Sequence, residues 1–267
     1  MQRALILAAL AWVTIAFAAT IRVEQDGTGD FTDLADAEAA ASAGDTLLIG
    51  PGEWSDIYDW GQAEVHRDSV VLGVTTDSLT ILGVSGADVV LAGPEALTNR
   101  DFVYGIAVHP DVSLVTIRDL TIARWTEGVI TAAGNTVVEG VTVRECATGL
   151  YFAGGSGTVR DAEFRRNWRQ ALYVRPPLAV HDWIVEISGC SFEGDQEGVR
   201  GYLSADVGVV DCTFTDVGAG LVTSGSLRAS ALIFDGGRLP FSVHSYGSLD
   251  VEDVVVRGAT FGGLYHS

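Results

Sequence analysis

From residue 112 to residue 267 the apolar and polar positions follow one pattern that returns about every 21 residues. Each repeat has an apolar residue, one polar residue and another apolar residue, then two spacers and the same pair again. The last apolar residues of the repeats, spaced by 21, 21, 28, 22, 20 and 22 positions, are Ile122, Val143, Phe164, Phe192, Phe214, Phe234 and Val256. A fixed period in this range is typical of stacked supersecondary units, each too small to bury its own apolar face.

Each repeat also contains a third short apolar segment, for example at 105–108, 149–152 and 171–174. Three strands per repeat predict a triangular coil, and successive coils then rise by about one strand spacing, roughly 4.8 Å. We therefore predict an all-β fold, a single-stranded right-handed parallel β-helix with three strands per coil.

The segment before these coils predicts one helix, which would cap the N-terminal end of the β-helix. A short strand and a glycine-rich turn lead to Asp30 or Thr32 as the expected N-cap, and the helix is expected to run to about Ala43. A strand at 46–49 and the turn at 50–52 follow.

These residues also carry a family resemblance. The segment IRVEQDGTGDFTDLADAEAAASAGDTLLIGPGEW, residues 21–54, resembles the start of the pectate-lyase-like superfamily of right-handed parallel β-helices, which includes the pectinesterases. In that family a capping helix and a strand ending in Pro-Gly-aromatic lead into the coils, and Trp54 stands at the aromatic position here. The resemblance implies the fold and does not by itself imply an activity.

The start of the chain predicts export. Met1-Gln2-Arg3, the apolar run from Ala4 to Phe17 and the small residues around Ala18 correspond to a charged tip, an h-region and a cleavage site. The run is shorter than the roughly 20 apolar residues that span a bilayer. We expect a signal peptide at 1–18 and one β-helix domain at 19–267, with its cap at 19–54 and regular coils at 105–267. The expected location is secreted or extracytoplasmic, in the periplasm or at the cell surface.

The charge balance narrows the partners. The chain has 35 acidic residues, 16 arginines, no lysine and a net charge of -19. An acidic protein of this kind lacks the basic footprint that nucleic acid needs, and an anionic polysaccharide would need a local basic patch. Without lysine, any proton abstraction falls to Arg, His, Tyr or a carboxylate.

The 28-residue interval between Phe164 and Phe192 is the one clear break in the repeat. Insertions in solenoids emerge on one face and often build a binding site. His181 and Asp182 in this insertion, with Glu186 on the next strand, are candidate catalytic residues because an imidazole beside a carboxylate titrates near neutral pH. The alternative is a solvated loop pair without catalytic function.

A candidate binding surface follows from the alternation of the third strands. Tyr and Arg side chains occupy outward positions there, a pattern that suits sugar binding through ring stacking and guanidinium pairing. The alternative is a set of cross-strand stacks that only stabilise the sheet. The candidate binding residues are Tyr151, Tyr173, Arg175, Trp183, Arg200 and Tyr202, and the same outward row continues at Val222 and Ser242.

Two other signals are weaker. Glu193, Asp195 and Glu197 fall at alternate positions in one turn, where carboxylates can hold Ca²⁺, but the nonapeptide Ca²⁺ repeat is absent, and no other metal or cofactor is predicted. Cys190 and Cys212 hold the same place in consecutive repeats, as buried free thiols or as a disulfide.

The resemblance supplies no complete catalytic signature. The string at 101–105 is similar to the pectinesterase Asp-Phe-aliphatic-Phe-Gly motif, yet the partner motifs of that family and of the polygalacturonases are missing. We therefore favour an exported, non-catalytic β-helix protein that binds polysaccharide or surface glycan, or serves as a structural surface element. The alternative is an enzyme acting on pectin-like polymers, a lyase, hydrolase or esterase, with a groove beside the 175–186 loop. We also expect the last coil to expose strand edges that can pair with another chain. The alternatives are cover by a further segment, or protection by Tyr265, His266 and the modest length of the last strands.

Overall fold

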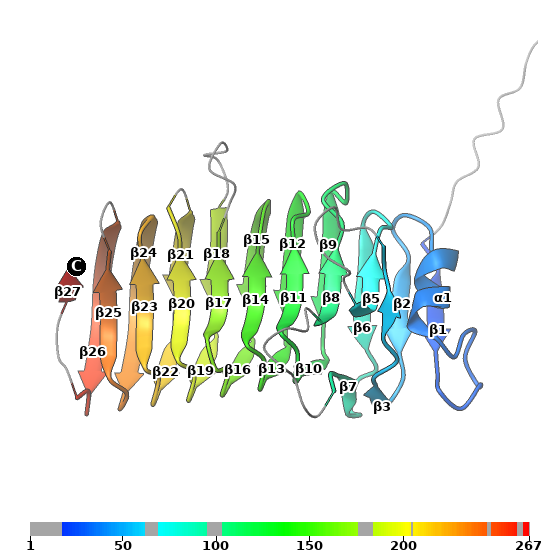
Figure 1. Cartoon of the computed structure of the whole chain (residues 1–267), viewed down its shortest axis with the longest axis horizontal. Coiled ribbons are helices and arrows are strands. Elements are labelled where there is room, and N and C mark those ends of the chain that lie inside the picture. The colour runs from blue at the N-terminus through cyan, green and yellow to red at the C-terminus, as the bar shows by residue number, and fades with distance from the viewer. Residues whose placement is uncertain are drawn as a thin grey trace, which may run out of the picture.

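The computed structural model describes residues 18–61, 69–94, 103–175, 184–203, 205–244, 247–260 and 264–266. In these ranges the strands stack into an elongated solenoid, and the helix α1 (Leu34–Ala40) lies at its N-terminal end (Figure 1). The predicted parallel β-helix with three strands per coil is thereby confirmed. The expected signal peptide at 1–18 falls, except for Ala18, outside the described residues.

Each coil contributes one strand to each of three columns of parallel strands, here called the first, second and third columns. The first column contains β1 (Thr20–Val23), β2 (Thr46–Ile49), β6 (Leu79–Gly83), β9 (Leu114–Arg118), β12 (Asn135–Glu139), β15 (Ser156–Arg160), β18 (Ile184–Ser188), β21 (Asp206–Val210), β24 (Ser226–Asp235) and β26 (Ser248–Arg257).

The second column contains β3 (Gly52–Trp54), β7 (Val89–Ala92), β10 (Thr121–Ala123), β13 (Thr142–Arg144), β16 (Glu163–Arg165), β19 (Ser191–Glu193), β22 (Thr213–Thr215) and the second halves of β24 and β26. The third column contains β5 (Ser69–Val74), β8 (Val103–Val108), β11 (Glu127–Thr131), β14 (Thr148–Phe152), β17 (Gln170–Val174), β20 (Glu197–Gly201), β23 (Ala219–Thr223), β25 (Leu239–Val243) and β27 (Leu264–His266), with β4 (Tyr58–Asp59) antiparallel to β5. The outer surface of the third column is called the third-strand face below, and that of the first column the first-strand face.

The inward residues of successive coils stack into columns, as the period predicts. Phe164, Phe192, Phe214 and Phe234 are stacked with ring centroids 4.9, 4.6 and 4.6 Å apart and nearly parallel planes. The 28-residue interval does not disturb this register, because β16 and β19 pair with Phe164 opposite Phe192. The extra residues lie at 176–183, outside the described residues.

The helix begins later and ends earlier than the sequence suggests. The N-cap is Asp33, whose carboxylate accepts hydrogen bonds from the amides of Ala35 (2.8 Å) and Asp36 (3.0 Å). The predicted caps are wrong because Asp30 instead accepts the amide of Arg22 at 2.8 Å. The chain leaves the helix at Ala41, two residues before Ala43, in extended conformation.

Two corners turn each coil, and both use a residue with positive φ. The first corner joins the first and second columns, and the second corner joins the second and third. In the described coils from β9 onward, the positive-φ residues of the first corner are Asp119, Gly140, Asp161, Gly189, Asp211, Ala231 and Asp253. Those of the second corner are Arg124, Glu145, Arg166, Gly194, Asp216, Gly236 and Gly258.

The last coil is less covered than the others. Val256, which continues the phenylalanine column, is 44% exposed, and β26 is the terminal strand of its columns. The expected pairing of this edge with another chain stays a prediction. All three cysteines are buried free thiols, and burial raises the pKa of Cys146 to about 12. Among the described helices, none has the length and apolar character needed to cross a membrane.

Candidate functional site

The third-strand face is covered at its N-terminal end. The segment around β4 folds over β5 and β8, where the Tyr58 hydroxyl accepts a hydrogen bond from the Gly73 amide at 2.9 Å. Tyr58 and Trp60 pack on a small outer cluster of buried residues, and Ile130 borders it. The buried members of this cluster are Val70, Tyr104 and Ala107.

The same face is also closed toward its C-terminal end. Val222 and Ser242 follow the predicted outward row in register, yet only 2% and 6% of their surfaces are exposed. The open part therefore lies on β14, β17 and β20, where Tyr151, Tyr173 and Arg200 lie side by side in register. This open part is called the window below. The structure thus brings Tyr151, Tyr173 and Arg200, three of the residues predicted for sugar binding, together on three successive coils.

The rings of the two tyrosines in the window stack on each other. Tyr151 and Tyr173 are stacked with centroids 5.2 Å apart and planes 16° from parallel. A pyranose has no room on the faces between them, so the stacking role suggested by the sequence is not available there.

Arg175 joins the aromatic residues of the window. Its guanidinium lies 5.3 Å from the centroid of the Tyr202 ring, a cation–π distance, and it interacts with the hydroxyls of Tyr151 and Tyr173. Burial raises the pKa of both tyrosines while Arg175 opposes the shift, so both hydroxyls remain protonated donors at neutral pH.

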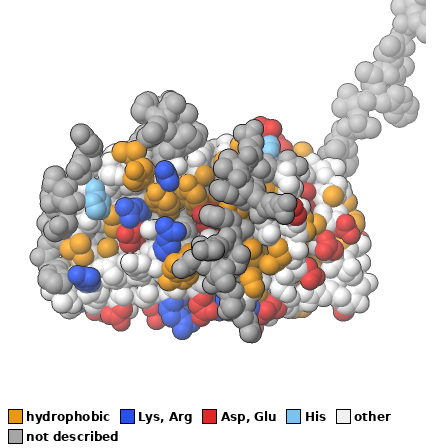
Figure 2. All heavy atoms as spheres, viewed as in Figure 1, with side chains coloured by type: hydrophobic (Ala, Val, Ile, Leu, Met, Phe, Trp, Pro, Cys, Tyr) orange, Lys and Arg blue, Asp and Glu red, His pale blue; other side chains and the backbone are white. Residues whose placement is uncertain are grey.

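The two arginines of the window differ in their partners. Arg200 is paired with Glu197 at 2.8 Å. Arg175 is exposed and has no carboxylate partner among the described residues. In Figure 2, blue arginine atoms and orange hydrophobic atoms lie close together over the middle of the face turned to the viewer. Arg175 is therefore available to an anionic ligand.

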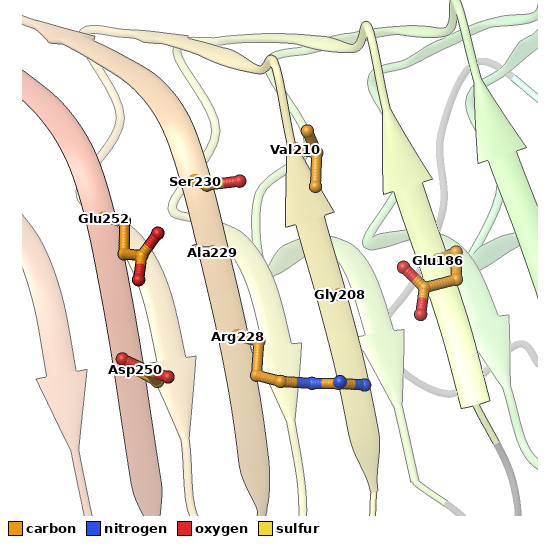
Figure 3. Close-up of a pocket in the computed structure, with 8 residues that line it drawn as sticks. All are labelled: Glu186, Gly208, Val210, Arg228, Ala229, Ser230, Asp250 and Glu252. Carbon is orange, nitrogen blue, oxygen red and sulfur yellow. The ribbon is translucent and has the colours of Figure 1, made fainter.

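Glu186 lies on a different surface, the first-strand face. Glu186, Gly208, Arg228 and Asp250 are register partners on β18, β21, β24 and β26. Because Gly208 has no side chain, Glu186 lies over it and Arg228 extends toward it from the other side (Figure 3). This leaves an open hollow of about 230 Å³, lined by Glu186, Gly208, Val210, Arg228, Ala229, Ser230, Asp250 and Glu252.

The charge of this hollow is mostly negative. Arg228 is the one cation among its described lining residues, and its Nη2 atom lies 3.4 Å from both carboxylate oxygens of Asp206. Glu186, Asp250 and Glu252 add further carboxylates. Such a surface disfavours an acidic polymer and suits a neutral sugar or a positively charged group.

The three candidate Ca²⁺ ligands do not converge. Asp195 is 1% exposed and points into the second corner, where it accepts hydrogen bonds from Asn167. Glu197 pairs with Arg200, while Glu193 is exposed and lies 3.8 Å from Arg165. No group of three metal-ligating side chains occurs in the described part of the chain.

The remaining candidates, His181, Asp182 and Trp183, lie outside the described residues. Arg228 and Gly208, which shape the hollow, were not identified from the sequence. The available signal was the glycine at an outward position of the repeat 207–214, where neighbouring repeats carry polar or charged residues.

Comparison with known proteins bears on the fold alone. No protein-family model and no curated protein matches the sequence. The crystal structure of alginate lyase from Paenibacillus sp. str. FPU-7 is similar over 93% of this chain and 98% of that chain, at 14% identity and a TM-score of 0.59. The crystal structure of pectate lyase Pel9A is similar over 94% of this chain and 80% of that chain, at 14% identity and a TM-score of 0.48. The chain thus has the pectate-lyase-like parallel β-helix fold.

Proposed function

We propose that this chain is an exported, non-catalytic β-helix protein that binds polysaccharide or surface glycan through its third-strand face. The observation that carries the proposal is Arg175, an exposed guanidinium held between tyrosine hydroxyls and the Tyr202 ring without a carboxylate partner among the described residues. Such a group pairs with sugar carboxylates or hydroxyls. The likeness of the fold to an alginate lyase supports a polysaccharide as the class of ligand.

The test measures retention on a panel of immobilised acidic and neutral polysaccharides, with soluble sugar products assayed in the same samples. We expect retention without product release, and about tenfold weaker binding for Arg175→Ala. Arg257→Ala removes the same charge from the last coil and should bind as the wild type does. Retention on none of the polymers would contradict the proposal.

The hollow around Glu186 favours a second candidate function, a polysaccharide-active enzyme of the lyase, hydrolase or esterase type. An open site with carboxylates on both sides of a guanidinium suits acid–base chemistry on a neutral sugar polymer. Product release by the wild type that is lost in Glu186→Gln would establish this function in place of the first. No product from any polymer would remove it.

Export belongs to the proposal and rests on the N-terminal sequence. Expression of the chain with its own first 18 residues should place the mature protein outside the cytoplasm, with its N-terminus at Ala19. A variant that starts at residue 19 should remain in the cytoplasm. Equal location of the two forms would contradict this part.

A further inference from the structure

One stretch of this acidic protein is locally basic. Residues 144–175 contain six arginines and three acidic residues, whereas the whole chain has 16 basic and 35 acidic residues. The stretch runs from the end of β13 to the residue after β17. At physiological ionic strength, charges separated by more than about 8 Å are largely screened, so a polyanion at this surface responds mainly to the local arginines.

Trp168 is the exposed aromatic residue of this stretch. Trp168 is 48% exposed, whereas the other aromatic residues in the described ranges are buried or half-buried. The backbone beneath it is held by the coil stack, since Trp168 donates to the Cys146 carbonyl and Arg169 to the Ala147 carbonyl, both at 3.0 Å. Unlike the stacked tyrosines, this indole offers a solvent-accessible surface on which a pyranose can stack.

Arginines surround this residue in the sequence, and most of them are loosely held. Arg166 pairs with Glu145 at 2.9 Å and Arg165 with Glu163 at 2.7 Å, in pairs that are largely exposed. Exposed ion pairs of this kind contribute little to stability, so a ligand carboxylate can replace the protein's own carboxylate. Figure 2 shows blue and red side chains together along the lower edge of the molecule, below β16 of Figure 1.

Arg169 is the best placed of these arginines. It is exposed and has no carboxylate partner among the described residues. It immediately precedes β17 and Arg175 immediately follows it, so the two arginines flank one strand and their Cα atoms are about 20 Å apart. Tyr173 lies between them on the third-strand face.

We propose that an acidic polysaccharide binds along β17, with one sugar stacked on Trp168 and sugar carboxylates paired with Arg169 and Arg175. The inference rests on the proposed function, names its ligand class and adds a subsite at the second corner. The polymer then runs across the coil, along the strand direction, and not along the axis of the solenoid. The acidic first-strand hollow plays no part in this binding.

The test compares polygalacturonate with its methyl-esterified form, because the ester keeps the sugar backbone and removes the charge. Affinity is measured by calorimetry. Because the chain has six tryptophans, the part of the iodide quenching of tryptophan fluorescence that Trp168→Phe removes reports the exposure of Trp168. We expect the acidic form to bind at least about tenfold more tightly, to weaken as salt rises, and to protect tryptophan from iodide.

Variants then place the ligand. Trp168→Ala and Arg169→Ala should each weaken polygalacturonate binding about tenfold. Trp168→Phe should retain most of the affinity, and Arg257→Ala all of it. Unchanged thermal unfolding of the variants confirms that they remain folded.

The outcomes separate this inference from the proposed function. If Arg175→Ala weakens binding but Trp168→Ala and Arg169→Ala do not, the subsite is overturned while glycan binding stands. Equal binding of the acidic and esterified forms overturns the ligand class in the same way. Absence of binding to every polysaccharide overturns both.

Discussion

The first and second corners of each coil turn the chain with the same backbone conformation but differ in what surrounds it. At the first corner, aspartates alternate with glycine or alanine, so no two carboxylates lie directly above one another. At the second corner, a buried column of Trp125, Cys146, Asn167, Asp195 and Val217 lies inside the turn. Outside the turn lie the exposed residues Arg165, Arg166, Trp168 and Arg169. The first corner therefore only shapes the coil, whereas the second combines a buried polar network with the proposed binding surface.

A buried polar network predicts that the second corner is sensitive to substitution. Asn167 is fully buried, and its side chain accepts the Cys146 amide (3.0 Å) and donates to the Val143 carbonyl (3.2 Å) and to Asp195 (2.9 Å). Asp195 repeats this position one coil later, but its Oδ2 atom has no hydrogen-bond partner among the described residues. Burial raises the pKa of Asp195 to about 7.

The largest expected effect comes from Asp195→Asn. The folded-state pKa of about 7 exceeds the ordinary value of 3.8, so the protein is expected to lose stability as the pH rises from about 4 through 7. Asparagine carries no charge, and its amide would face the Phe164 carbonyl as Asn167 faces Val143. We expect a free energy of unfolding higher by about 4 kcal/mol at pH 8, and little difference at pH 4. Urea unfolding across this pH range measures it, and a pH-independent difference would contradict it.

Asn167→Ala should have the next largest effect, in the opposite direction. The change leaves the buried Cys146 amide and Val143 carbonyl without these partners. We expect a loss of about 3 kcal/mol in the free energy of unfolding. Thermal or urea unfolding at neutral pH measures it, and a loss below about 1 kcal/mol would show that the network does not stabilise this corner.

At the first corner, Gly189→Ala should cost less. Gly189 has a φ of 62°, and a Cβ there would lie 2.7 Å from the Asp161 Oδ1 atom. We expect a loss of about 1 to 2 kcal/mol in the free energy of unfolding. The matched control is Ala231→Gly at the equivalent position with a φ of 54°, which should stabilise by about 1 kcal/mol. Destabilisation by both changes would contradict the account of this corner.

The smallest effect on stability should come from Glu145→Gln, on the outside of the second corner. Glu145 pairs with Arg144 at 3.0 Å and with Arg166 at 2.9 Å. Its loss should change the free energy of unfolding by less than about 1 kcal/mol. Binding of polygalacturonate should become several-fold tighter, since two arginines lose a competing carboxylate. Asp235→Asn, an equal charge change on β24, should leave binding unaltered, and weaker binding by Glu145→Gln would contradict the proposed subsite.

Local alternation accounts for the parts of the fold that were predicted correctly. The column from Ile122 to Val256 and the outward row from Tyr151 to Arg200 follow from strand periodicity, which depends only on neighbouring residues. The helix cap was wrong because two nearby carboxylates competed for it, and the tertiary contact of Asp30 with the Arg22 amide left the cap to Asp33.

Exposure could not be predicted in the same way, because it depends on segments far apart in the sequence. The segment around β4 covers the N-terminal part of the third-strand face, and Val222 is buried in a row where Tyr173 is not. Alternation likewise does not predict that the rings of Tyr151 and Tyr173 stack on each other while Trp168 is exposed.

The sequence by itself determined the scaffold: the period, the parallel β-helix, the inward columns and the acidic charge. Only the tertiary structure decided which outward residues are open, which carboxylates are already paired, and that the glycine at 208 creates a hollow beside Glu186. The physical reason is that a repeat encodes contacts between adjacent coils. A binding surface instead depends on which outward side chains other segments cover, where the repeat is interrupted, and which charged side chains have no internal partner.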